Sequence, residues 1–333
     1  MRRKHIDDVQ PATVKEHYDL ILKEESLINH EPHNITPEDL PDWYDEKLFK
    51  IHQSLYARNI ISFVIGVLVG FIGLFAVPSI SKVLWYVKGS HTPCLAYKRY
   101  YQTLLYMHHV YLADLQNSDD KFYKYINTIR YKHTFNSNKA RNGNGEGIYQ
   151  RDMVLTQVAA IGYIFVMPEV FGLRIKPEEE MAMIHVWRVM GRMLEIPDRI
   201  NVCRKDVAET RELFLMLIDK FSAHLNNPSP EYNELTNALL DGLWYGNIGI
   251  NKEAFLMFIY QLNNVKHKIS LRWYNWIILK CYKFIFRLLL IPYIGPVTKI
   301  IFNKTILITL YFAQNLPLIA WMSFGRKKSQ LIL

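Results

Sequence analysis

Five side chains in two short segments have the types and the spacing that could bind a redox cofactor. Arg99, Gln102 and Thr103 lie in CLAYKRYYQTLLYMHH, and Arg130 and His133 lie in YINTIRYKHTF. Residues three and four apart are neighbours on a helix, so each set is predicted to share a helix face. An imidazole can ligate the iron of a haem, and guanidinium groups can neutralise its propionates. The spacing therefore suggests haem binding as a hypothesis.

The same residues also allow a purely structural interpretation. A single histidine on a helix is more often part of the core or the surface than a metal ligand. Arg130 could pair with Asp119 or Asp120, and the sequence has no Cys-x-x-Cys-His motif for haem attachment. Residue types and spacing leave both interpretations open.

The two segments resemble the rubber oxygenase (latex-clearing protein) family, to which the endoplasmic-reticulum-bound oxygenase MpaB also belongs. That family has Arg-x-x-Lys-Thr followed by Arg-x-x-His, where this chain has Arg99-x-x-Gln102-Thr103 and Arg130-x-x-His133. The similarity covers residues 85–260 and includes YQRDMVLTQVAAIGYIFVMPEVFGL (149–173) and IHVWRVMGRMLEIPDRINVC (184–203).

This resemblance implies that His133 is the proximal ligand of a b-type haem. It also implies that Arg99, Thr103 and Arg130 hold the haem and the groups around it. One position departs from the family pattern, because Gln102 stands where rubber oxygenases can have a lysine. A neutral amide is a poor iron ligand, but it can hydrogen-bond dioxygen, so Gln102 and Thr103 are the candidate catalytic residues.

Several residues downstream allow more than one role. On the helix predicted over 177–195, Arg188 could meet a second propionate and His185 could line a substrate pocket, or both could be structural. Thr156 or Gln157 could face the pocket. Glu195 stands where a glycine would be natural, at the end of a helix where the backbone takes a positive φ.

The periodicity of apolar residues predicts the fold class. Apolar residues recur at three- and four-residue spacing along most of the 333 residues, and strand-type alternation is nearly absent. We expect an all-α protein, a single large helical domain around a haem pocket. Residues 1–45 are predicted to form a polar arm with a helix start at Thr36, and 46–260 the haem domain. Residues 136–147 (NSNKARNGNGEG) are predicted to be a loop within it.

The charge distribution sets the C-terminal segment apart. After Glu253 the chain has 11 of its 40 Lys and Arg and none of its 31 Asp and Glu, threaded between long apolar and aromatic runs. A membrane surface fits this pattern better than nucleic acid does, because rings and aliphatic chains enter the interface while cations face anionic headgroups. Residues 261–333 are therefore predicted to form membrane-associated helices.

A second apolar run covers residues 59–81 without a charge. Its length allows it either to cross a bilayer or to be a buried helix beside the haem domain. Residues 304–323 are also just long enough to cross a bilayer.

The sequence as a whole predicts a haem-dependent oxygenase attached to an intracellular membrane, the endoplasmic reticulum by resemblance. The resemblance implies haem b, dioxygen and a hydrophobic substrate of isoprenoid or lipid-like character. The alternatives are a non-catalytic haem-binding protein and a helical membrane adaptor that has lost the activity.

Overall fold

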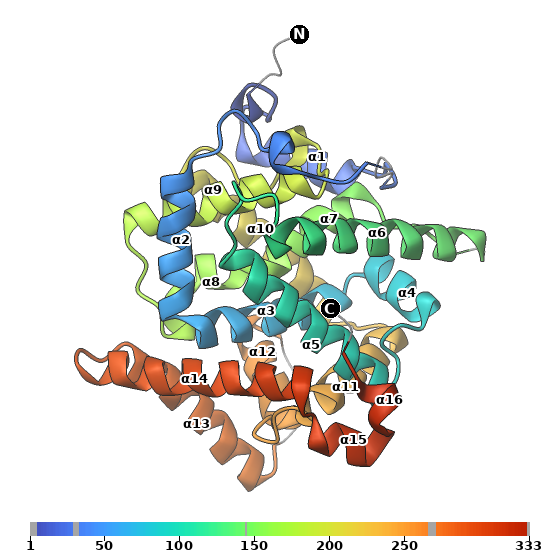
Figure 1. The fold of residues 1–333 in the computed structure, drawn as a ribbon, viewed down its shortest axis with the longest axis vertical. Coiled ribbons are helices and arrows are strands. Elements are labelled where there is room, and N and C mark those ends of the chain that lie inside the picture. Colours follow the sequence, from blue (N-terminus) through green and yellow to red (C-terminus); the bar gives the residue numbers. More distant parts are fainter. Residues whose placement is uncertain (1–4, 29–32, 144, 266–270, 332–333) are drawn as a thin grey trace.

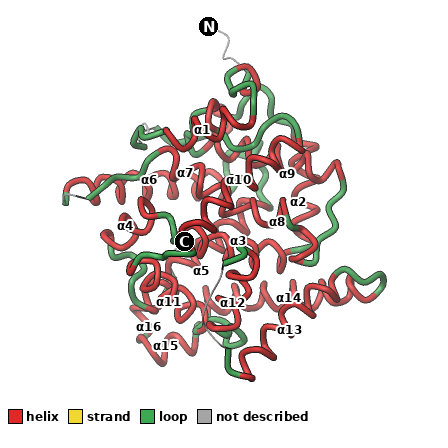
Figure 2. The backbone as a smooth tube through the Cα atoms, turned by 180° about the vertical axis from the view of Figure 1, so that it is seen from behind, coloured by secondary structure: helices red, strands yellow, loops and turns green. Residues whose placement is uncertain are grey.

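Helices make up the architecture, as the periodicity predicts. The computed structural model describes residues 5–28, 33–143, 145–265 and 271–331. Within those ranges the chain forms one large helical domain without a β-strand (Figure 1; Figure 2). The α-helices are, in chain order, α1 (Val14–Lys23), α2 (Glu46–Arg58), α3 (Ile60–Phe75), α4 (Pro78–Val87), α5 (Pro93–Tyr111), α6 (Lys121–Asn142), α7 (Gln150–Gln157), α8 (Tyr163–Val166), α9 (Pro177–Met193), α10 (Val207–Leu225), α11 (Pro230–Trp244), α12 (Lys252–Leu262), α13 (Trp273–Leu289), α14 (Ile294–Asn315), α15 (Leu318–Phe324) and α16 (Arg326–Ser329).

The centre of the core is α3. Every residue of this helix except Ile65 is buried. Of the two predictions for the apolar run 59–81, this agrees with a helix buried in the core. The run is not one helix, because α3 ends at Phe75 and Pro78 begins α4. A proline suits the first helical position because its missing N–H is not needed there.

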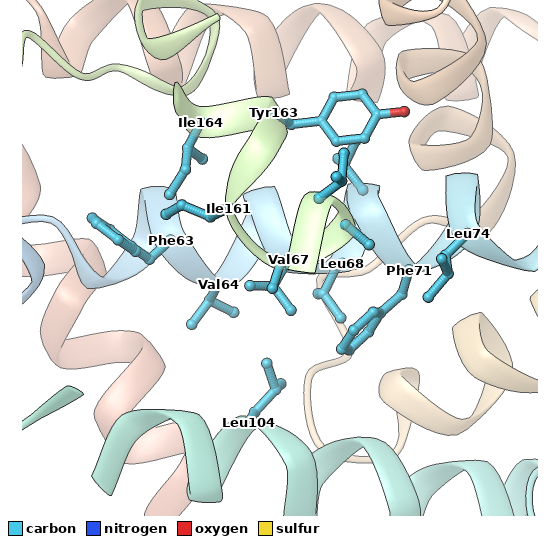
Figure 3. Close-up of a cluster of buried hydrophobic side chains, with 14 of the residues drawn as sticks. Phe63, Val64, Val67, Leu68, Phe71, Leu74, Leu104, Ile161, Tyr163 and Ile164 are labelled. Carbon is cyan, nitrogen blue, oxygen red and sulfur yellow. The ribbon is translucent and has the colours of Figure 1, made fainter. Parts of the chain in front are cut away.

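A π-helical turn, Val158–Gly162, lies directly against α3 (Figure 3). It joins α7 to α8 and brings the carbonyl of Ala159 so near Gly70 that a Cβ on Gly70 would lie 1.7 Å from that oxygen. Only a glycine allows two backbones to approach this closely. Gly70 therefore sets the packing of the central helix.

The two helices that bear the sequence motifs are fixed at their starts by capping side chains. The Thr92 hydroxyl accepts a hydrogen bond from Leu95 N (3.4 Å) before α5, and Asp120 Oδ1 accepts one from Phe122 N (2.7 Å) before α6. Such caps satisfy backbone N–H groups that have no partner within the helix.

The predicted loop over 136–147 is wrong for its first half, because α6 continues to Asn142. Ala140 is buried against Val83 and Val87 of α4, and the Ser137 hydroxyl accepts a hydrogen bond from Ile148 N (3.0 Å). These tertiary contacts stabilise the helix where composition favours a loop. The helix start at Thr36 is confirmed as the N-terminus of a short 3-10 helix, Pro37–Asp39.

The C-terminal helices α13 and α14 pack against each other, and with α15 they lie along the lower side of the view in Figure 1. In the part of the chain that the structure describes, no single helix combines the length and apolar composition needed to cross a bilayer. Two pairs of consecutive helices have this length and composition when taken together, but each pair is bent at the break between its helices: α2 and α3 by 92°, and α14 and α15 by 41°.

Candidate functional site

A cavity of about 170 Å³ brings together three of the five motif residues. Arg99 and Thr103 reach it from α5, and His133 reaches it from α6. Asp152 and Thr156 of α7 and the Tyr100 phenol of α5 supply its other charged and hydroxyl groups. The remaining walls are apolar and come from the end of α3, from α4 and from the segment at the start of α7: Phe71, Leu74, Phe75, Ile80, Val83, Leu84, Ile148 and Met153.

Arg99 has capacity to bind an anion. Its Nη1 donates to the Ser90 hydroxyl (3.3 Å), and the guanidinium carbon lies 6.0 Å from the centroid of the Tyr100 ring. Among the described residues Arg99 has no carboxylate partner. A guanidinium with several unused donors beside an apolar cavity suits a carboxylate on a ligand.

Two threonines of the cavity wall make the same kind of hydrogen bond. Thr103 Oγ1 donates to the carbonyl of Arg99 (2.9 Å), and Thr156 Oγ1 donates to that of Asp152 (2.7 Å). With its hydrogen committed to its own helix, each hydroxyl can still accept a hydrogen bond. Of the two alternatives at 156 and 157, Thr156 faces the cavity, whereas the Gln157 amide donates to the carbonyl of Trp187 (3.0 Å).

Asp152 links two walls of the cavity. Its Oδ1 accepts a hydrogen bond from the Ser79 hydroxyl of α4 (2.8 Å), and its Oδ2 accepts one from Tyr149 N (3.1 Å). Burial raises the pKa of this carboxyl. The sequence points to Asp152 only as a favourable charge at a helix start, and its spacing of four from Thr156 is the signal that could have placed it on the cavity.

Arg130 is not on the cavity wall, although it lies three residues before His133. Its side chain is buried, and it donates to the His33 carbonyl (2.9 Å) and to Asn127 Oδ1 (3.3 Å). Its Nη2 lies 2.6 Å from Glu195 Oε1. Arg130 thus fixes α6, and with it His133, to the segment after α9 and to the loop before α2.

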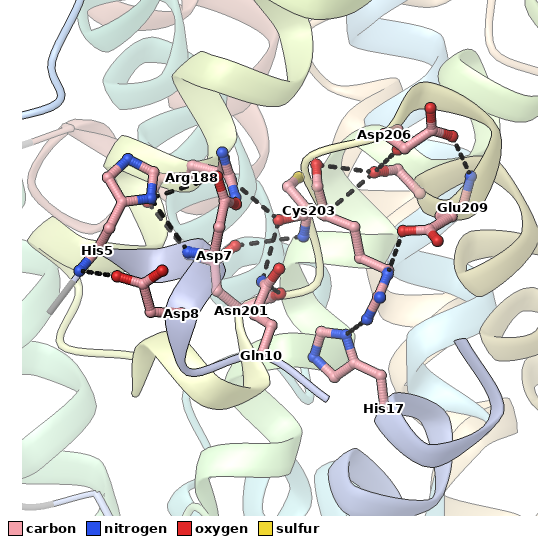
Figure 4. A network of polar contacts seen from close by, with 12 residues as sticks. His5, Asp7, Asp8, Gln10, His17, Arg188, Asn201, Cys203, Asp206 and Glu209 are labelled. Atoms are coloured by element: carbon pink, nitrogen blue, oxygen red, sulfur yellow. Dashed lines mark hydrogen bonds and ion pairs between the residues drawn. The ribbon is translucent and has the colours of Figure 1, made fainter. Parts of the chain in front are cut away.

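Gln102 is part-buried on α5 but is not among the residues that line the cavity. Arg188 is further removed. It forms an ion pair with Asp7 and donates through Nε to the carbonyl of Cys203 (3.2 Å), within a polar network that joins the N-terminal segment to the loop after α9 (Figure 4). His185, also on α9, accepts a hydrogen bond from Asp45 N (2.9 Å) through Nε2, and burial lowers its pKa to about 4.

One solved structure has the same fold as this chain. A solved structure of latex clearing protein in its closed state superposes with a TM-score of 0.58 over 90% of this chain and 85% of that one, at 17% sequence identity. The chain has the fold of latex clearing protein. No protein-family model matches the sequence, and no curated protein matches it significantly. At this identity, the similarity to latex clearing protein concerns the fold alone.

The donor set around the cavity fits a haem. A haem needs one protein ligand to iron, a cation near its propionates and apolar contact with its ring. His133, Arg99 and the aromatic and aliphatic walls provide these. In the described ranges no three His, Cys, Asp or Glu side chains are grouped as a site built from protein ligands alone would need. The cavity is smaller than the roughly 300–1,000 Å³ of small-molecule pockets, so a haem would have to move its walls apart.

Proposed function

We propose that this protein is a haem-b-dependent oxygenase that acts on a hydrophobic substrate, related in function to the rubber oxygenases and MpaB. The observation that carries the proposal is the convergence of Arg99, Thr103 and His133 on one cavity. These residues come from two helices, within a fold shared with latex clearing protein. Arg99, Thr103 and His133 are also three of the five residues that bear the sequence resemblance to the family.

Each of the three residues has a separate task in this proposal. The His133 imidazole ligates the iron, and Arg99 binds a propionate through guanidinium donors that the protein does not use. Thr103 presents an acceptor to a polar group in the cavity. Arg130 acts through the backbone, because its bonds to Glu195 and the His33 carbonyl hold α6 in place. The bound haem would supply the oxygen chemistry.

The walls suit a substrate of isoprenoid or lipid-like character. Phe71, Phe75 and Leu84 exclude water and offer no hydrogen-bonding group. This apolar part of the wall can bind hydrocarbon through the hydrophobic effect and leave the reaction to the cofactor.

We also propose that the protein lies on an intracellular membrane, the endoplasmic reticulum by family resemblance. Of 28 large hydrophobic side chains exposed in the described ranges, 18 fall between residues 273 and 322. The segment after Glu253 has no acidic residue. Exposed aromatic and aliphatic side chains with interspersed cations are typical of a helix surface that enters the headgroup region of a bilayer.

A second function is favoured by one observation at Gln102. This residue replaces the family lysine and does not line the cavity. A haem-binding protein without oxygenase activity would retain His133 and Arg99 and have no need of a distal lysine. A membrane adaptor without haem would need neither His133 nor Arg99 for its function.

The absorption spectrum of haem-replete protein, oxidised and reduced, tests the proposal. We expect a Soret band that is lost in His133→Ala and kept in His224→Ala, a half-buried histidine at the end of α10. Dioxygen uptake with a hydrophobic substrate would then separate the oxygenase from the non-catalytic haem protein. Protein without a Soret band in either form would reject both and leave the adaptor.

A further inference from the structure

A second cavity, of about 280 Å³, lies beside the first and shares no lining residue with it. Val64 and Leu68 of α3 point toward Leu104 of α5 across this space (Figure 3). The other walls come from α11, α12, α13 and α14. On α5, Tyr100 and Thr103 face the His133 cavity, whereas the adjacent Tyr101 and Leu104 face this one.

None of the described residues that line the second cavity is charged, and three of its polar side chains are hydrogen-bonded within the protein. Tyr101 donates to the Leu243 carbonyl (2.9 Å), and Thr305 donates to the Ile301 carbonyl (3.0 Å). The Tyr282 hydroxyl donates to the Gly249 carbonyl (3.1 Å) and accepts from Asn251 N (2.9 Å). The space therefore presents an almost wholly apolar surface.

Such a surface selects an apolar occupant over water. A buried water needs two to four polar partners, and an apolar cavity of roughly 150 Å³ stays dry and binds small hydrocarbons. The second cavity is almost twice that size. Filling it with hydrocarbon restores dispersion contacts that its lining side chains otherwise lack.

The helices that cover this cavity indicate what kind of hydrocarbon can reach it. Phe286 of α13 and Leu310 of α14 are buried against it, while Phe284 and Ile308 on the same helices are exposed. The cavity thus lies directly beneath the exposed apolar surface of the molecule. The segment that forms this cover has cations and no acidic residue, which suits an anionic amphiphile.

We propose that the second cavity binds the hydrocarbon chain of a single-chain anionic lipid, such as a fatty acid, between the core helices α3 and α5 and the cover formed by α13 and α14. This site is separate from the His133 cavity and does not depend on haem. It is a binding site in its own right, whatever the reaction at the first cavity.

Titration of the purified full chain with the fluorescent fatty acid cis-parinaric acid tests the proposal. We expect saturable binding of one molecule per chain. The double variant Val64→Phe/Leu104→Phe, which fills the cavity, should weaken binding at least tenfold. Leu215→Phe makes the same kind of change on the exposed face of α10 and should leave binding unchanged.

Two further variants keep the test decisive. Thr309→Trp narrows the cavity from α14, at a partly exposed position that the core does not depend on, and should weaken binding even if the double variant fails to fold. His133→Ala removes the proposed iron ligand and should bind the fatty acid as the native chain does. Absence of saturable binding, equal binding by Thr309→Trp, or loss of binding in His133→Ala would each overturn the proposal. The last result would place the fatty acid in the first cavity, and none of them bears on the Soret band.

Discussion

The carboxylate of Glu195 lies 2.6 Å from the guanidinium of the buried Arg130, and Glu195 holds a left-handed backbone conformation (φ 56°) at the end of α9. Ile196 N donates to the Gly191 carbonyl (2.9 Å) and Glu195 N donates to the Arg192 carbonyl (3.0 Å), which is a Schellman motif. The position usually taken by glycine is here taken by the partner of an arginine. Glu195, in this strained conformation, thus forms the ion pair that holds α6, the helix that bears His133.

Two substitutions at this position separate the ion pair from the strain. Glu195→Ala should destabilise the protein by about 2 kcal/mol, because Arg130 loses a charged hydrogen-bond partner. Glu195→Gly loses the same partner but relieves the positive φ, so it should be more stable than Glu195→Ala by about 1–2 kcal/mol. Urea unfolding of both variants measures the difference. Equal stability of the Glu195→Gly and Glu195→Ala variants would mean that the left-handed conformation at this position costs no free energy.

Arg99 and Arg188 should respond differently to loss of charge. Arg99→Gln should weaken haem binding by roughly tenfold or more, the value of one charged hydrogen bond. Arg188→Gln should leave haem affinity unchanged and lower stability, because Arg188 pairs with Asp7 and Cys203 away from the cavity. Haem titration followed at the Soret band, with urea unfolding alongside, measures both effects. Equal loss of haem affinity in the two variants would mean that Arg188 also takes part in haem binding.

Gly70 should tolerate no side chain. Gly70→Ala would drive a methyl group into the Ala159 carbonyl, so we expect a loss of about 3 kcal/mol or more in the free energy of unfolding. Gly89→Ala is the matched control, because its methyl group would meet only Arg99 Nη1, at 3.5 Å. Thermal unfolding of the pair tests whether α3 and the π-helical turn are as close as described. A mild effect at Gly70 would mean that the two segments can separate.

His52 should make the protein sensitive to acid. It is fully buried, neither ring nitrogen has a hydrogen-bond partner among the described residues, and burial lowers its pKa from 6.5 to about 3. As the pH falls below 6.5 the unfolded chain binds a proton that the folded chain does not. Stability is therefore full above that pH and is lost between 6.5 and about 3. At about pH 4.5 the loss is on the order of 2–3 kcal/mol.

His52→Leu removes this proton-binding group at nearly constant volume. Urea unfolding between neutral and acid pH should show a flatter decline for His52→Leu than for the native chain. Since His17 is also buried, with a pKa lowered to about 4 by burial and by Arg204, some decline should remain. Identical slopes in the two proteins would show that His52 binds its proton in the folded state.

The proposed membrane face should distinguish lipid compositions. We expect the protein to co-sediment with vesicles containing phosphatidylserine more strongly than with phosphatidylcholine alone, and added salt should reduce the difference. Trp273→Ser/Trp276→Ser should weaken binding, since both rings are more than half exposed on α13. Trp85→Ser, an exposed tryptophan on α4, is the control. Equal binding by native protein and the α13 variant would remove α13 from the interface.

Local spacing in the sequence is enough to predict which side chains share a helix face. The interval of four from Arg99 to Thr103 is enough to put both on one face of α5, and the family pattern adds His133. The unusual backbone at Glu195 could also be predicted, because a helix end favours a glycine there. In both cases the information lies within one helix or its cap.

Sequence reasoning failed where the partner is distant in the chain. Arg130 is three residues from His133, but three residues on a helix differ by about 60° in direction, which is enough to turn one side chain from the cavity toward Glu195. Arg188 pairs with Asp7, a residue 181 positions away, and no local pattern contains that contact. The second cavity was missed for the same reason, because six helices from both halves of the chain enclose it.

The N-terminal network has a consequence for how the chain is made. The Gln10 amide donates to the carbonyls of Asn201 and Cys203, and Arg204 donates to those of Pro11 and Ala12. A ribosome adds roughly 5–20 residues per second, so the first segment waits on the order of 10–40 seconds before its docking site exists. During that time the apolar side of the α1 segment lacks its partner α10. The segment around Gln10 is therefore synthesised well before the residues that hold it, and it must stay available for docking until they emerge.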